Sequence, residues 1–422
     1  MPELRSAVQD LTAGTSPVPD LTDPRSFLPE PPYQVWAALR RSGRLHYQER
    51  EGAPGFHSVT RYRDIDRVLR DSAGFSSEWG MTLDSALGVH DPAAGKMIEL
   101  TDPPRHQRLR RLVSGGLNRS VARTMDGVLR ERVQRWVEQA VADGETDFVR
   151  SVSERVPAAA TGLLLGLPER EWDRLADRAG RALCGSLAVD DERVGDLDAR
   201  RHSTATANGQ LLVHLAGLLD HAELAEEGLI RRLLDAELDG DRLTREEVLL
   251  NCLNLAIAGN ETTKNATTGG LLAFAGNPEQ WQRLRRRPEL LDQAVEEVLR
   301  YTTPPLHFTR TVLEPRTVAG TALRPGELLC LWMPSANRDE EVFPDPDDFR
   351  IERNPNPHLA FTSGKHFCLG APLARLEIRL VLEALLTHVE SIHLLGAPVR
   401  RPTNLVTAYA SLPVALRRCT RS

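Results

Sequence analysis

Apolar positions along the chain recur mainly at helical spacing, and the strands that the pattern predicts are few and short. A helix is predicted over residues 31–43, where Gly43 ends it. Residues 44–50 and 55–61 have the composition of two short strands, and residues 121–237 are charged and helical in pattern. We therefore expect a mainly α fold with small β-sheets.

The longest helical pattern lies near the middle of the chain. Thr244 and Glu247 form a capping-box pattern at its start, and Gly276 with the following Asn-Pro pair ends it. Roughly thirty residues at about 1.5 Å each give a rod of about 45 Å. Because such a rod crosses a whole domain, we expect this helix to be central.

Further helices are predicted over 288–305 and 370–389, on either side of a stretch of β-type residues at 309–339. The tripeptide DPP at 102–104 precedes one more helical run. An aspartate can cap a helix and proline is tolerated in the first turn, so we expect Asp102 to cap this helix.

Composition is that of an ordinary globular protein, with 41% hydrophobic and 27% charged residues among 422. The net charge of −6 argues against a nucleic-acid binder. The N-terminal segment is polar and rich in proline, and the most apolar internal stretch, 248–259, is too short to cross a bilayer. We expect no membrane contact and a single domain over 1–422 with an extended lead at 1–30.

Five cysteines are present, an odd number at irregular spacing and without a C-x-x-C pair. This pattern is not typical of a disulfide framework, a zinc site or a redox dithiol. A reducing, cytoplasmic compartment is the simplest expectation. The cysteines are Cys184, Cys252, Cys330, Cys368 and Cys419.

Cys368 has unusual neighbours in the stretch FTSGKHFCLG, which directly precedes a helical pattern. A helix N-terminus stabilises an anion, and two glycines allow close approach of the backbone. Phe361 and Phe367 can shield the sulfur from water, while Lys365 and His366 supply positive charge. These features favour a thiolate metal ligand. A buried free cysteine, or a nucleophile with His366 as its base, is the alternative.

Acid and hydroxyl groups interrupt the apolar stripe of the long helix in AGNETT, residues 258–263. Buried polar groups must be satisfied, and threonine can bond back to the helix backbone and bend it. A local opening of the helix would leave room for a small molecule or water. The alternative is an exposed polar helix face.

The stretch FTSGKHFCLG resembles the cysteine-ligand loop of the cytochromes P-450, the haem-thiolate monooxygenases, whose pattern is F-G-x-G-x-[HR]-x-C-x-G. The matches are Phe361, Gly364, His366, Cys368 and Gly370. The resemblance extends over nearly the whole chain, in the motif order of the bacterial soluble members. It implies a P-450 fold with the long helix over haem b, and Cys368 as the axial thiolate.

Thr362 departs from the family pattern, which usually has glycine there. A β-branched residue is strained at positive φ, so we expect Thr362 in the ordinary extended region.

AGNETT resembles the family's [AG]-G-x-[DE]-T-[TS] motif. The resemblance implies that Gly259 marks the oxygen site, that Thr262 hydrogen-bonds the bound oxygen and that Glu261 relays protons. Four further residues match propionate contacts, namely His106, Arg110, Arg310 and His366. By position alone, the substrate pocket is expected to include Trp79, Met81, Leu83, Leu255, Ala258, Asn260, Leu306, His307, Phe308, Val406 and Tyr409.

Glu297 and Arg300 lie on one helix face and resemble the family's E-x-x-R ion pair, with Arg350 or Arg353 as the third member. The role expected for this group is structural. A basic face that could steer an acidic ferredoxin or flavodoxin is expected from Arg105, Arg108, Arg111, Lys365, Arg375 and Arg379.

The resemblance implies a haem-dependent monooxygenase that inserts one atom of O2 into a small organic substrate. We expect hydroxylation in bacterial secondary metabolism, of a terpenoid, a polyketide or an amino acid held on a carrier protein. Electrons would come from NAD(P)H through a separate redox protein. A haem-thiolate sensor without turnover and a cysteine hydrolase without haem are the alternatives, and the pairing of Glu261 with Thr262 favours catalysis.

Overall fold

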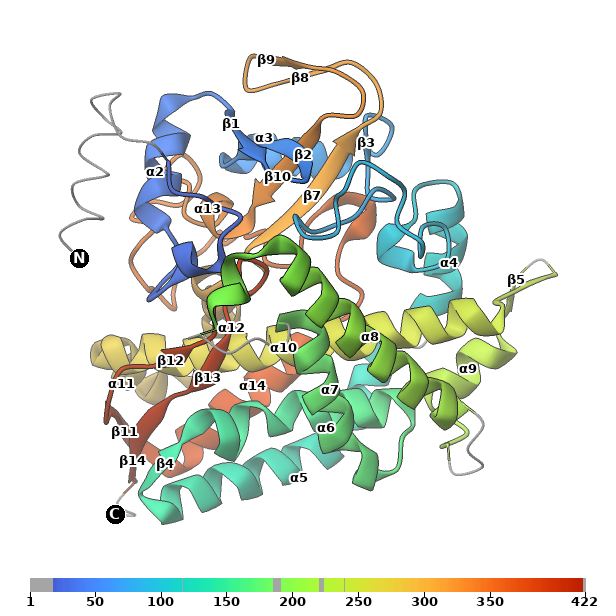
Figure 1. Ribbon diagram of the computed structural model, residues 1–422. Helices are drawn as coiled ribbons and strands as arrows, with labels where there is room; N and C mark the ends of the chain where they lie inside the picture. The colour runs from blue at the N-terminus through green and yellow to red at the C-terminus, as the bar shows by residue number, and fades with distance from the viewer. Residues whose placement is uncertain (1–17, 116, 185–190, 220–223, 239, 420–422) are drawn as a thin grey trace.

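The computed structural model of the protein describes residues 18–115, 117–184, 191–219, 224–238 and 240–419, which form a helix-rich body with small sheets (Figure 1). This confirms the predicted mainly α architecture. The α-helices are α2 (Tyr33–Ser42), α3 (Tyr62–Arg70), α4 (Arg105–Ser114), α5 (Arg119–Asp143), α6 (Arg155–Leu165), α7 (Trp172–Cys184), α8 (Leu197–Leu219), α9 (Leu229–Asp235), α10 (Arg245–Gly276), α11 (Pro278–Arg286), α12 (Leu291–Thr302), α13 (Met333–Ala336) and α14 (Ala371–His388). Shorter helical segments are η1 (Pro24–Phe27), η2 (Ile98–Leu100), η3 (Val149–Ser153), η4 (Glu169–Glu171), η5 (Glu192–Gly195), η6 (Pro288–Leu290) and η7 (Gly364–His366).

The largest described sheet has five strands in the order β1-β2-β10-β7-β3. Its strands are β1 (His46–Arg50), β2 (Ala53–Val59), β10 (Leu328–Trp332), β7 (His307–Val312) and β3 (Phe75–Ser76). All neighbours pair antiparallel except β10 with β2. Figure 1 shows this sheet in the upper part of the molecule with α2, α3 and α13 around it.

Smaller sheets complete the described fold. A three-stranded sheet has the order β11-β14-β4, and the other pairs are β12-β13, β5-β6 and β8-β9. Their strands are β11 (Val389–Leu394), β14 (Pro413–Arg418), β4 (Glu145–Asp147), β12 (Val399–Arg400), β13 (Tyr409–Ser411), β5 (Glu237–Leu238), β6 (Asp241–Arg242), β8 (Arg316–Val318) and β9 (Thr321–Leu323).

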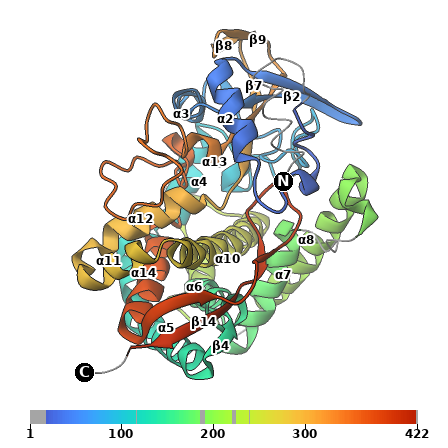
Figure 2. The ribbon, with the colours of Figure 1, turned by 90° about the vertical axis from the view of Figure 1, so that its left-hand side faces the viewer.

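Helix α10 lies at the centre of the helical part, as its length predicted. It packs against α6, α7, α8, α12 and α14, and Figure 2 looks nearly along its axis with these helices around it. The Thr244 hydroxyl accepts from the backbone N–H of Glu247, whose carboxylate accepts from Thr244 N in return. This capping box satisfies the first turn and fixes where α10 begins.

The prediction that Asp102 caps α4 is wrong. The helix begins at Arg105 after Pro104, and no side chain caps it. The two prolines separate Asp102 from the first turn, so only its carbonyl accepts from His106 N, at 3.0 Å. Its carboxylate instead accepts hydrogen bonds from Ser76 and from Ser77 Oγ (3.0 Å), which ties α4 to the end of β3.

The predicted lead at 1–30 is described only from residue 18, and residues 1–17 lie outside the described residues. The described part is not wholly extended, because η1 forms one helical turn capped by the Asp23 carboxylate. Among the described residues, no helix combines the length and apolar composition that crossing a bilayer requires.

Candidate functional site

A cavity lies between α10 and the loop that precedes α14. It is lined from segments that are far apart in the sequence, because β7, the chain near residue 98 and the chain near residue 405 all reach it. Among the residues selected from the sequence, those that line it are Met81, His106, Arg110, Leu255, Ala258, Gly259, Thr262, Phe308, Arg310, Phe361, Thr362, His366, Phe367, Cys368, Gly370 and Val406.

Cys368 lies just before α14, whose N-cap is Gly370. Its backbone N–H donates to the Phe361 carbonyl at 3.1 Å, and its sulfur accepts from the N–H groups of Gly370 and Ala371. Burial nevertheless raises the pKa of the Cys368 thiol to about 11. Because a metal cation displaces the proton of a thiol that it binds, this environment suits a metal ligand better than a free nucleophile.

His366 does not serve Cys368 as a base in the described part of the chain, where no hydrogen bond joins the two side chains. Burial, together with the nearby charge of Arg310, lowers the pKa of His366 to about 2. Its ring lies against that of His106, with 4.3 Å between the centroids. The geometry therefore disfavours the hydrolase alternative.

The two phenylalanines of the loop differ in burial. The Phe361 side chain is 8% exposed and closes the cavity beside the sulfur, whereas Phe367 is 40% exposed. Shielding of the sulfur therefore falls mainly to Phe361.

The prediction that Thr362 has an extended backbone is wrong. Its φ is +60°, in the left-handed region that suits glycine. The turn needs this twist, because Thr362 N donates to the Leu359 carbonyl at 2.9 Å while Phe361 presents its own carbonyl to Cys368. The Thr362 hydroxyl donates to the His366 carbonyl at 2.9 Å, which offsets part of the strain.

Four groups that line the cavity favour a bound anion, namely His106, Arg110, Arg310 and His366. Both ring nitrogens of His106 are buried and have no hydrogen-bond partner in the described part of the chain. Burial lowers the pKa of Arg310 to about 10, and burial with the charge of Arg110 lowers that of His106 to about 4. Arg110 also donates to the carbonyls of Lys365 and Phe367. Two carboxylates, such as the propionates of haem, would satisfy this donor set, so these residues fit the cofactor.

The polar segment of α10 is helical without interruption, so the local opening is absent from this described helix. The Thr262 hydroxyl donates to the Ala258 carbonyl at 2.6 Å, and the Thr262 side chain lines the cavity. Glu261 is also buried but does not line the cavity. Its carboxylate accepts from Lys264 Nζ at 2.6 Å and lies against α7, where a Cβ on Gly180 would come within 2.8 Å of it.

Six residues expected in the substrate pocket do not line the cavity. Trp79 packs against His90, and Leu83 and Leu306 join the buried cluster beneath the five-stranded sheet. His307 accepts from the Leu83 N–H at 2.9 Å. The Asn260 side-chain amide donates to the Ala256 carbonyl of its own helix, and the Tyr409 backbone N–H donates to the Asn265 side chain.

Two acidic residues and an asparagine that the sequence analysis did not select also reach the cavity, namely Glu99, Glu377 and Asn254. Burial raises the pKa of Glu377 well above the ordinary value, and its Oε2 atom has no hydrogen-bond partner in the described structure. Asn254 lies one turn before Ala258 on α10, so helical spacing was the one available signal for it.

Glu297 and Arg300 form a fully buried ion pair at 2.8 Å. Arg353 is the third member, because its Nε lies 3.2 Å from Glu297 Oε2. The Arg350 guanidinium instead binds Asp345 and Asp348, and only the Arg350 N–H reaches Glu297. The group ties α12 to the segment that leads to the cysteine loop.

The expected basic face is partly neutralised. Acidic residues pair with four of its six members, in the ion pairs Arg105–Glu247, Arg108–Asp241, Arg375–Glu296 and Arg379–Asp292. Arg111 and Lys365 are exposed.

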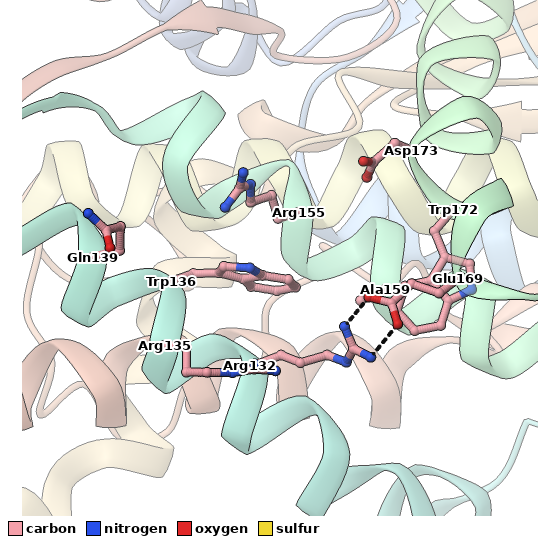
Figure 3. A pocket seen from close by; sticks show the side chains of 9 residues that line it. All are labelled: Arg132, Arg135, Trp136, Gln139, Arg155, Ala159, Glu169, Trp172 and Asp173. Atoms are coloured by element: carbon pink, nitrogen blue, oxygen red, sulfur yellow. Dashed lines mark hydrogen bonds and ion pairs between the residues drawn. The ribbon is translucent and has the colours of Figure 1, made fainter.

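A separate hollow lies on the surface over α5, α6 and η4 (Figure 3). Arg132 binds the Glu169 carboxylate with two hydrogen bonds and stacks over Trp172, while Arg155 lies over Trp136. Its arginine and aromatic side chains thus satisfy one another, and it shares no lining residue with the cavity at Cys368.

The mainly helical fold, the long central helix and the cysteine loop at the same cavity are the arrangement expected of a haem-thiolate protein. A family model described as cytochrome P-450 matches residues 219–393. The steroid C26-monooxygenase of Mycolicibacterium smegmatis is 33% identical over 90% of both chains. Cytochrome P-450 NovI of Streptomyces niveus is 31% identical over 91% of this chain and 92% of its own.

A solved structure of similar fold is that of P-450 OxyD, which is involved in the biosynthesis of vancomycin-type antibiotics. It superposes with a TM-score of 0.82 at 32% identity and covers 95% of this chain and 100% of its own. The chain belongs to the cytochrome P-450 family. It is a haem-dependent monooxygenase, an oxidoreductase that uses O2, holds haem through a cysteine thiolate, takes a small-molecule substrate and receives electrons from a redox partner.

Proposed function

We propose that Cys368 is the axial ligand of the haem and that the chain, as one domain over 1–422, hydroxylates a small organic substrate in bacterial secondary metabolism. The observation that carries this assignment is the position of Cys368, which faces Thr262 across the cavity and lies beside buried groups that need an anion. The involvement of OxyD in the biosynthesis of vancomycin-type antibiotics supports a role in secondary metabolism. The substrate that we propose is a terpenoid, a polyketide or a carrier-bound amino acid.

His106, Arg110, Arg310 and His366 would hold the haem propionates. When bound, haem supplies the iron at which O2 is activated and a substrate C–H bond is oxidised. The hydroxylation consumes O2, a pair of electrons and a pair of protons, and it yields an alcohol and water. The protein must therefore deliver protons into a cavity whose walls are largely apolar.

Thr262 and Glu261 are suited to this delivery. The Thr262 hydroxyl already lies at the cavity wall and can exchange its bond to Ala258 for one to a group in the cavity. Glu261, paired with Lys264, lies one residue behind it on the side of α7. Leu255, Phe308 and Val406 limit the entry of other water.

The electron source that we propose is a ferredoxin or flavodoxin reduced by NAD(P)H in the cytoplasm, with an acidic surface that complements Arg111 and Lys365.

The test of the ligand assignment is the spectrum of Cys368→Ser. The wild-type protein should give the red-shifted Soret band of a thiolate-ligated haem in its reduced carbon monoxide complex. Because the propionate-binding groups are intact, Cys368→Ser should still bind haem but lose the shift and all hydroxylation.

Cys419→Ser is the matched control, since this half-buried cysteine lies next to Arg285 and should leave the spectrum unchanged. A red-shifted band in Cys368→Ser would refute the assignment, and a wild-type protein that binds no haem would refute the proposed function.

A further inference from the structure

Two cavities meet at Glu99 and Asn254. The cavity at Cys368 adjoins a second one of about 360 Å³ that extends toward α8 and residues 402–405. Both are lined by Met81, Thr82, Glu99, Leu183, Asn254, Ile257 and Leu405. A molecule that lies across both cavities must therefore contact this shared wall, where Glu99 is the only charged side chain among the residues that the structure describes.

Glu99 is held firmly against α10. It belongs to η2, whose Ile98 N–H donates to the Asn251 side chain at 3.0 Å, and the Asn251 amide in turn donates to the Lys96 carbonyl at 2.9 Å. One turn further along α10, the Asn254 side chain donates a hydrogen bond to the Glu99 carboxylate. Asn251 thus holds the η2 backbone against α10, and Asn254 lies beside the Glu99 carboxylate.

The charge of Arg310 reaches the Glu99 carboxylate, but the two side chains form no ion pair in the described structure. No lysine or arginine forms an ion pair with it in the described part of the chain, and burial raises its pKa to about 7 against the effects of Asn254 and Arg310. Arg310 donates to the Thr309 carbonyl and lies among the propionate-binding groups. Glu99 is half-buried, and a carboxylate partly removed from water without an ion-pair partner costs free energy that a positively charged ligand would recover.

The second cavity is acidic as a whole. Its lining includes Asp84, Asp91 and Glu99 against a single described cation, Arg200. Arg200 is already engaged, because its guanidinium forms two hydrogen bonds of 3.1 Å with Asp84. The charge that remains on the wall of the second cavity is therefore negative. The positive groups of the adjoining cavity are those that would hold the propionates.

We propose that Glu99, positioned by Asn251 and Asn254, binds a protonated amine of the substrate and so selects amine-bearing molecules for oxidation. This inference rests on the proposed function, since the amine anchor would place the rest of the molecule along α10 toward Thr262. A hydroxyl donor could also bond to Glu99, but it would leave the buried charge unpaired.

The experiment compares two probes of the same shape in the haem-loaded protein. N,N-dimethyloctylamine is cationic at neutral pH, and 2-methyldecane is its carbon analogue. Binding is followed by the shift of the ferric Soret band. The wild-type protein should bind the amine at least tenfold more tightly than the hydrocarbon, and Glu99→Gln, which keeps the shape and the hydrogen bond of Asn254, should abolish this preference while leaving 2-methyldecane unchanged.

Glu246→Gln is the matched control, because it removes one negative charge at the exposed start of α10, where Glu246 pairs with Lys96, and should leave both affinities unchanged. The proposal is overturned if the wild-type protein binds both probes equally, if Glu99→Gln weakens both equally, or if the Soret band shifts to the red as it does when a nitrogen ligates iron. It is also overturned if 1-decanol loses as much affinity as the amine in Glu99→Gln. Failure of the proposed function would be visible beforehand, as a protein without haem or without the thiolate spectrum.

Discussion

The hydroxyl of Thr362 stabilises the cysteine loop, whereas its backbone conformation destabilises it. Its left-handed backbone costs about 1–2 kcal/mol in an L-residue with a side chain, whereas its hydroxyl bond to the His366 carbonyl contributes about 1 kcal/mol. The family pattern relieves the strain with glycine, and this chain instead adds a hydrogen bond across the same turn.

Replacing Thr362 separates the two effects. Thr362→Ala loses the hydrogen bond and keeps the strain, so we expect its free energy of unfolding to fall by about 1 kcal/mol. Thr362→Gly loses the bond but also the strain, and should be more stable than Thr362→Ala by about 1 kcal/mol. Urea unfolding followed by far-UV circular dichroism gives both values. Equal stability of the two variants would contradict the left-handed backbone.

Residues close together in sequence were easier to predict than residues that meet only in the fold. The position of Cys368 ahead of a helix and the Thr244–Glu247 capping box are local, so spacing alone indicated them. Whether Arg350 or Arg353 completes the Glu297–Arg300 group depends on which side chain turns toward Glu297. Residue spacing cannot predict that direction. Thr362 has a positive φ because the turn must present the Phe361 carbonyl to the Cys368 N–H. This contact outweighs the preference of a β-branched side chain for negative φ.

At the scale of elements, the cysteine loop depends on how α12 and α14 are held together. Glu296 on α12 accepts two hydrogen bonds from Arg375 on α14, at 2.6 and 2.8 Å, and lies 3.2 Å from His358 in the preceding loop. Although burial alone would raise it, the hydrogen bonds from Arg375 and His358 lower the pKa of Glu296 to about 2. The Glu296–Arg375 ion pair therefore links α12, which carries the buried Glu297–Arg300 pair, to α14, which follows Cys368.

The Glu296 contact predicts a stability that depends on pH. Because its pKa is 4.5 when unperturbed and lower in the fold, the contact contributes fully above pH 4.5 and is lost as the pH falls toward 2. Glu296→Gln should lower the free energy of unfolding by about 1 kcal/mol at pH 7, with the difference narrowing below pH 4.5. Urea unfolding at several pH values measures it.

Glu352→Gln is the comparison for this prediction, because the ion pairs of Glu352 with Arg283 and Arg287 are exposed and should contribute little at any pH. A difference between wild type and Glu296→Gln that stays constant down to pH 3 would show that the contact is not ionic.

At the scale of the molecule, a chain with a net charge of −6 carries its cysteine loop beside exposed positive side chains. Ion pairs occupy four of the six basic residues expected there, so the field that reaches solvent near the loop depends chiefly on Arg111 and Lys365. The sequence indicated which basic residues to expect near the loop, although the composition is acidic, but the ion pairs that weaken their field required the fold.

This charge distribution predicts how salt affects electron transfer. Arg111→Glu should slow reduction of the ferric protein by an acidic ferredoxin about tenfold at low ionic strength, and high salt should remove most of the difference. Stopped-flow absorbance of the haem measures the rate. Arg417→Glu makes the same charge change on β14 and should leave the rate nearly unchanged, whereas equal slowing in both variants would refute steering by this surface.

Gly180 has a consequence for the directed evolution of this protein. It lies on α7, outside the cavity wall, yet its missing side chain is the space into which the Glu261 carboxylate extends. Any larger residue there must displace that carboxylate, so under the proton delivery that we propose for Glu261 it would alter proton supply from outside the cavity. Mutant libraries restricted to cavity-lining positions would leave out Gly180, although we expect it to affect the efficiency with which reductant is converted to product.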